Sequence, residues 1–178
     1  MASPYTHALD KVQIVTFHFG DDGQIPNHPT LPLIVYKAVL RLDARDPAAI
    51  AEQLFAQHGW QGMWRNGIFD FPHYHSNAHE VLAICRGAAT VRFGGERGQT
   101  LVVQAGDVAF LPAGTGHQRL SPSGDLLVVG AYPPGQAPDL CRGSAAERPQ
   151  VLTNIQRVPL PERDPVYGTD GGGMTQYV

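Results

Sequence analysis

The sequence His73-Tyr74-His75, followed closely by Glu80, constrains this chain more than any other feature. Side chains alternate along a strand, so two histidines separated by one residue face the same side. A third imidazole, His117, follows a turn rich in Gly and Pro at residues 112–116. Imidazoles and a carboxylate that converge from separate strands form a mixed nitrogen and oxygen site, which suits a divalent transition metal.

These residues resemble the two motifs of the cupin superfamily. The first motif reads Gly, five residues, His-x-His, three or four residues, Glu, six residues, Gly, and every place is filled: Gly67, His73, His75, Glu80 and Gly87. The second reads Gly, five residues, Pro-x-Gly, two residues, His, three residues, Asn. It is matched by Gly106, Pro112, Gly114 and His117, with Ser121 in place of Asn. The resemblance covers residues 67–121.

The resemblance implies an all-β fold, an antiparallel jelly-roll barrel. It also implies one divalent transition metal (Fe, Mn, Ni, Cu or Zn) whose ligands are His73, His75, Glu80 and His117. It does not identify the reaction, because one fold hosts many chemistries.

Either His79 or Glu80 could be the fourth ligand, because the two residues are adjacent and a strand turns only one of them inward. Spacing from His75 allows either residue. The cupin pattern places six residues between the ligand and the next Gly, which selects Glu80. With Glu80 inward, Leu82 and Ile84 also line the interior, as bulky barrel residues do. His79 is then expected to face outward or toward the mouth, as a residue behind the ligands or a proton-transfer group.

The same parity predicts the walls of a substrate pocket. Phe69 and Phe71 share the parity of the histidines and are expected on the same interior. Leu82 is expected beside them. Arg119 shares the parity of His117, so it contacts either an anion in the cavity or an acidic residue at the rim.

Length and composition exclude several classes of protein. At 178 residues the chain fits one domain with a proper core, and its net charge of −3 without a basic run argues against nucleic acid. Residues 1–5 show no basic segment followed by an apolar run, so no signal peptide is expected, and the apolar run at residues 31–40 is too short to span a membrane. These features predict a cytoplasmic protein with no membrane partner.

The chain is predicted to divide into three parts. Residues 1–60 hold N-terminal strands and one short helix near 47–58, with Asp46 before it and Gly59 after it, packed on the barrel. Residues 61–135 form the cupin barrel core with both motifs. Residues 136–178 form an extended C-terminal tail, rich in Pro, Gly and charge.

Two classes of function follow from a cupin metal site. One is a small-molecule metalloenzyme, such as a dioxygenase acting on an anionic or enolisable substrate, or a sugar or keto-acid isomerase. The other is a module that binds or senses a small ligand without catalysis. The N-terminal strand and the tail offer more β-forming edge than one barrel needs, which predicts a homodimer.

Overall fold

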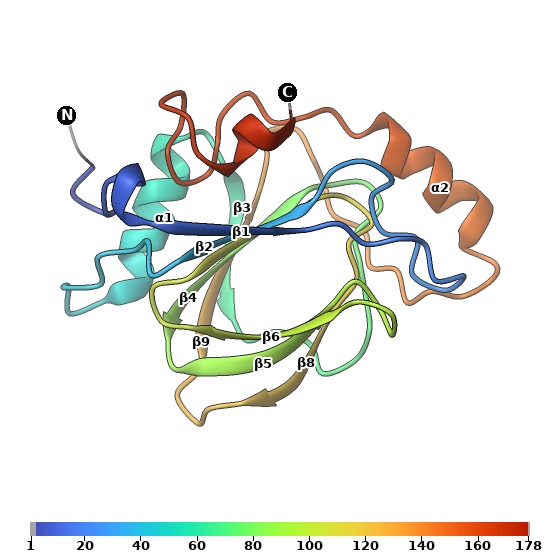
Figure 1. Cartoon of the computed structure of the whole chain (residues 1–178), viewed down its shortest axis with the longest axis horizontal. Helices are drawn as coiled ribbons and strands as arrows, with labels where there is room; N and C mark the ends of the chain where they lie inside the picture. The colour runs from blue at the N-terminus through green and yellow to red at the C-terminus, as the bar shows by residue number, and fades with distance from the viewer. Residues whose placement is uncertain (1–2, 178) are drawn as a thin grey trace.

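Two antiparallel sheets face each other and form the body of the molecule in the computed structural model, which describes residues 3–177, and the side chains of residues 3–175 (Figure 1). The larger sheet has six strands, in the order β1 (Gln13–Phe17), β2 (Leu33–Lys37), β7 (Val108–Leu111), β4 (Glu80–Arg86), β9 (Leu127–Tyr132) and β3 (Gln61–Asn66). The smaller has three, in the order β6 (Gln99–Gln104), β5 (Ala88–Phe93) and β8 (His117–Pro122). This arrangement confirms the predicted jelly-roll.

The space between the sheets holds a large apolar cluster. Its members alternate along β4, where Leu82 and Ile84 point into the barrel. Val91 and Phe93 of β5 meet them from the smaller sheet. Val81, Ala83 and Cys85 point to the other face of β4, so the parity predicted for this strand is confirmed.

The outer face of the larger sheet is covered by the helix α1 (Pro47–Gln57). The helix begins with Pro47 at a position that needs no backbone N–H, and Ile50, Leu54 and Phe55 form its buried stripe. Trp60, just beyond the helix, packs edge-on against Phe110 of β7, with ring centroids 5.7 Å apart. The predicted N-terminal helix is therefore confirmed.

The first and last parts of the chain differ from their predicted roles. β1 and β2 are hydrogen-bonded strands of the larger sheet, so they belong to the barrel rather than packing on it. The C-terminal segment is more than an extended tail, because it contains the helix α2 (Arg148–Arg157) (Figure 1). Val151 and Ile155 form the buried face of this helix. Their spacing of four residues is the apolar pattern in the sequence that indicates a helix here.

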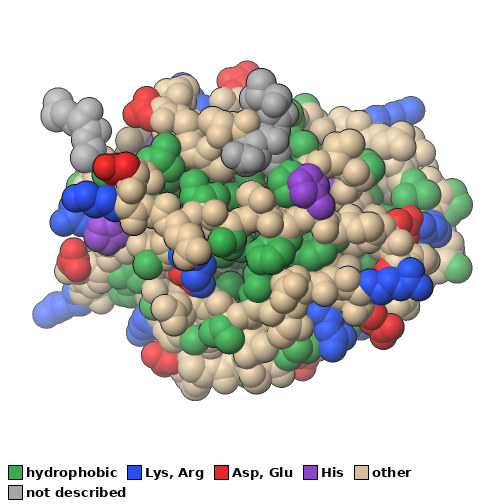
Figure 2. All heavy atoms as spheres, viewed as in Figure 1, with side chains coloured by type: hydrophobic (Ala, Val, Ile, Leu, Met, Phe, Trp, Pro, Cys, Tyr) green, Lys and Arg blue, Asp and Glu red, His purple; other side chains and the backbone are tan. Residues whose placement is uncertain are grey.

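Two short 3₁₀ turns, η1 (Leu9–Lys11) and η2 (Gly173–Tyr177), complete the elements. On the face that Figure 2 shows, basic and acidic side chains are interspersed and form no continuous basic patch. Among the described residues, no helix has the length and apolar character needed to span a membrane.

Candidate metal centre

Short backbone contacts bring the histidines together at one end of the barrel. The backbone N–H groups of His73 and His117 each donate to the other residue's carbonyl, at 3.2 and 2.9 Å. The Gly114 N–H, in the turn that leads to His117, donates to the carbonyl of His75 at 2.8 Å. Gly114 has φ +89°, and an added Cβ would lie 2.9 Å from a backbone oxygen of Asn27, so this turn requires glycine.

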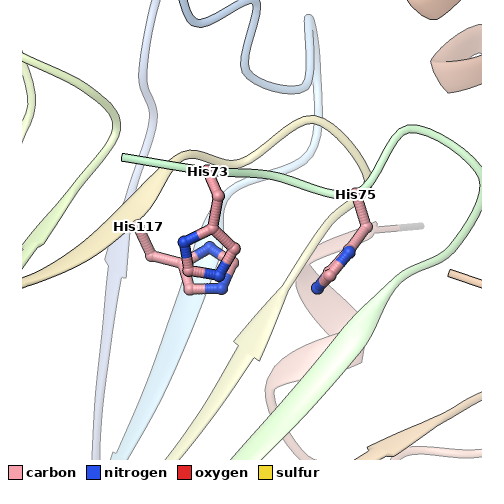
Figure 3. Close-up of side chains that lie close together, drawn as sticks. All are labelled: His73, His75 and His117. Atoms are coloured by element: carbon pink, nitrogen blue, oxygen red, sulfur yellow. The ribbon is translucent and has the colours of Figure 1, made fainter. Parts of the chain in front are cut away.

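The three imidazoles point into one space. Figure 3 shows the His73 and His75 side chains leaving one segment on the same side, with the His117 ring beside that of His73. One nitrogen from each of the three rings lies within 4.8 Å of the others. This group of histidines is one that can hold a metal ion.

Backbone carbonyls fix the protonation of each ring. His73 Nδ1 lies 3.1 Å from the carbonyl of Phe71, and His117 Nδ1 lies 3.1 Å from that of Thr115. His75 Nδ1 contacts the carbonyl of Asp139. A carbonyl only accepts hydrogen bonds, so each neutral ring carries its proton on Nδ1 and presents the Nε2 lone pair to the shared space.

Glu80 faces the same space from the start of β4. Its Oε2 lies 3.3 Å from His75 Nε2 and 3.2 Å from His117 Nε2, and the side chain is only 3 % exposed. This oxygen accepts no hydrogen bond from the described residues. Acceptors this close repel one another unless a cation or a proton lies between them.

This donor set fits a divalent transition metal. Donor atoms that bind one ion at about 2.1 Å lie about 3 Å apart when they are neighbours, which is the separation between Glu80 Oε2 and the two imidazoles. Without metal, a proton on His75 can separate its Nε2 from the Glu80 carboxylate. Burial opposes charging of His75, but the Glu80 carboxylate outweighs it and raises the pKa of His75 to about 9. Burial also opposes ionisation of Glu80, yet His75 and His117 hold its pKa well below the usual range.

The other Glu80 oxygen, Oε1, is held by Tyr132, which is positioned in turn by Trp64. The Tyr132 hydroxyl donates to Glu80 Oε1 at 3.2 Å and accepts the Trp64 indole N–H at 2.9 Å. Tyr132 shares the parity of Val128 on β9, which points into the barrel, so alternation along β9 was the signal for it.

We expect Tyr132→Phe to weaken metal binding by about 10-fold while the protein stays folded. The change removes one hydroxyl and leaves Glu80 Oε1 without its donor, and such supporting contacts are typically worth 10–100-fold in metal affinity. Titration of Mn²⁺ and Zn²⁺ against a chelator of known affinity measures the effect. Unchanged affinity would show that Tyr132 does not position Glu80.

A segment outside both motifs also supports the site. The Asp139 carboxylate accepts the backbone N–H of Ser76 at 2.6 Å, next to His75, whose ring contacts the Asp139 carbonyl. Cys141 pairs with Tyr74 between the two histidines, and Asn154 of α2 donates to the Ser76 hydroxyl at 3.0 Å. The C-terminal segment therefore holds the His73–His75 stretch from behind.

The site opens into a cavity of about 450 Å³. Its lining includes the three histidines and Glu80. Three of the residues predicted for the pocket, Phe69, Leu82 and Arg119, also lie on its walls, together with Ile68. Trp64 and Tyr132 also lie on the lining. The size suits a small organic ligand.

Two residues predicted near the site lie elsewhere. Phe71 does not line the cavity; it stacks on Phe69, with centroids 4.8 Å apart, and the Arg142 guanidinium covers its ring. Bends at residues 70 and 71 break the strand parity on which the prediction rested. His79 is fully buried rather than at the mouth, and its Nδ1 accepts the Ala113 N–H at 2.9 Å.

The geometry defines a jelly-roll barrel protein with a candidate mononuclear metal centre, and comparison with known proteins agrees. The family model described as a cupin domain matches residues 63–129. The uncharacterized protein YjlB of Bacillus subtilis (strain 168) is 42% identical over 153 residues, which cover 86% of this chain and 90% of that protein. The chain belongs to the cupin superfamily.

Solved structures resemble the fold at low similarity. Acireductone dioxygenase from Bacillus anthracis, with a cadmium ion in its active centre, is 13% identical at a TM-score of 0.39, covering 71% of this chain and 82% of that chain. A variant of oxalate decarboxylase from Bacillus subtilis is 23% identical at a TM-score of 0.31. It covers 57% of this chain, which spans 20% of the decarboxylase. At these values neither likeness bears on the reaction.

Proposed function

We propose that this protein is a metal-dependent enzyme of small-molecule metabolism, of the dioxygenase type, acting on an anionic or enolisable substrate. One observation carries the proposal: three imidazole nitrogens and a buried oxygen of Glu80 converge on the wall of a cavity sized for a small ligand. His73, His75, Glu80 and His117 would hold the ion. A divalent ion bound there supplies a Lewis acid and, for a redox-active metal, a centre for dioxygen chemistry.

The charge of the site supports an anionic substrate. Three neutral imidazoles and one carboxylate leave one positive charge on a divalent ion. The cavity walls contribute the guanidinium of Arg119 and the apolar side chains of Ile68, Phe69 and Leu82, beside the polar Asn66 and Asp70. In a cavity partly enclosed by protein an opposite charge is bound more strongly than in bulk water.

The test is metal content together with dioxygen uptake. We expect purified protein to contain close to one transition metal ion per chain. With iron, we expect the protein to consume dioxygen on at least one member of a panel of organic acids and diketones. His75→Ala is the control, because it removes a candidate ligand on the cavity wall. Tight binding of a panel compound that is recovered unchanged, without oxygen uptake, would favour a non-catalytic binding module; its rearrangement without uptake would favour an isomerase.

The predicted homodimer and the predicted cytoplasmic location belong to this proposal as well. Exposed apolar side chains on the C-terminal segment, Leu140 and Leu160, support an interface between copies.

A further inference from the structure

Arg119 lies on the same cavity as the candidate ligands, two residues beyond His117 on β8. Two strand residues separate Cα atoms by about 6.6 Å and turn both side chains to the same face. The Arg119 backbone N–H donates to the carbonyl of Phe69 at 2.9 Å, which places the Phe69 segment directly beside β8. A ligand at the metal therefore lies within reach of this guanidinium.

The sequence left two roles for Arg119, and its contacts favour the cavity role. Its nearest acidic oxygen, in Asp70, is 3.9 Å from the guanidinium, beyond hydrogen-bond distance, and the Asp70 side chain is 73 % exposed. Such an exposed pair contributes little. The Arg119 Nε, although buried, has no hydrogen-bond partner among the described residues. A buried donor without a partner is costly, which favours a ligand that supplies the acceptor.

Arg65, which also lines the cavity, does not compete for this role. Its guanidinium donates to Glu52 at 2.7 Å and to Asp46 at 2.9 Å, on the side of α1. Arg119 thus differs from Arg65 in having unused donors, and a guanidinium with free donors binds a carboxylate through two parallel hydrogen bonds.

Part of the cavity wall near Arg119 is apolar. Ile68 is buried, Leu82 belongs to the core between the sheets, and Phe69 is 48 % exposed. An aromatic ring left this open gains from covering by an apolar group of a ligand. The cavity therefore offers three kinds of contact: a metal centre, a free guanidinium and an apolar wall.

We propose that Arg119 is a substrate-binding residue that recognises a carboxylate. It would define the substrate class as small carboxylic acids with an apolar or aromatic group and a further oxygen that reaches the metal. This inference rests on the proposed metal site but not on any particular reaction.

The test uses phenylpyruvate and its primary amide as probes, because they differ only in the group that Arg119 would recognise. We expect zinc-loaded protein to bind the acid at least 10-fold more tightly than the amide in calorimetric titrations. We expect Arg119→Gln to remove this preference, because its affinity for the acid falls at least 10-fold. We expect Arg119→Lys to retain part of the preference. Arg86→Gln is the matched control, since it removes the same charge from an exposed residue outside the cavity lining.

Equal binding of acid and amide by wild-type protein, binding of neither, or an unchanged preference in Arg119→Gln would each overturn the inference. Its failure is distinguishable from failure of the proposed function. Dioxygen uptake without dependence on Arg119 would refute the carboxylate site alone. Binding of the acid that depends on Arg119, without dioxygen uptake on any panel compound, would refute the dioxygenase proposal alone.

Discussion

Glu80→Gln is expected to bind Mn²⁺ and Zn²⁺ at least about 100-fold more weakly than the wild-type protein, because Glu80 is the proposed fourth ligand and loss of a ligand exceeds the 10–100-fold typical of supporting contacts. The substitution preserves the size of the side chain but removes the charge that offsets the metal. Glu80 Oε2 is also the atom that lies between His75 and His117, at 3.3 and 3.2 Å. Competition with a chelator measures the affinities.

His79→Asn is the matched control for this experiment. The amide oxygen of Asn can still accept the Ala113 N–H that His79 Nδ1 accepts now, and His79 does not line the cavity. We expect its metal affinity to stay within about 10-fold of the wild-type value, the lower end of the effect of a supporting contact. If His79→Asn lost its metal while Glu80→Gln kept it, the assignment of the fourth ligand would be wrong.

Phe110→Ala is expected to lower the free energy of unfolding by about 3–5 kcal/mol. Phe110 is fully buried on β7, on the face of the larger sheet that α1 and Trp60 cover. Truncation leaves a void among rigid neighbours that collapse only in part. Urea denaturation followed by tryptophan fluorescence measures the change.

Val102→Ala provides the comparison for Phe110, because Val102 lies on β6 with 60 % of its surface exposed. We expect it to change stability by no more than about 0.5 kcal/mol. A loss below about 1 kcal/mol in Phe110→Ala would show that the layer between α1 and the sheet repacks, contrary to the rigid packing expected of a protein core.

Local spacing alone determined much of this protein. The alternation of His73 and His75, and of Leu82 and Ile84, follows from the period of two in an extended chain and holds wherever the chain stays extended. Asp46, Pro47 and Gly59 marked the ends of α1 within a residue or two. Such signals act between near neighbours, so they survive whatever the rest of the chain does.

Only the tertiary structure decided the surroundings of the site. Tyr132 and Asp139 lie more than fifty residues beyond Glu80 and His75. Alternation along β9 indicates only that Tyr132 faces the interior, and local sequence does not indicate which distant residue either of them contacts. Phe71 lies outside the cavity because two bends interrupt the strand. His79 is buried and does not face the mouth of the barrel. These outcomes depend on which distant segments cover a given face, and that choice is made by packing across the whole barrel rather than by the preferences of any short stretch.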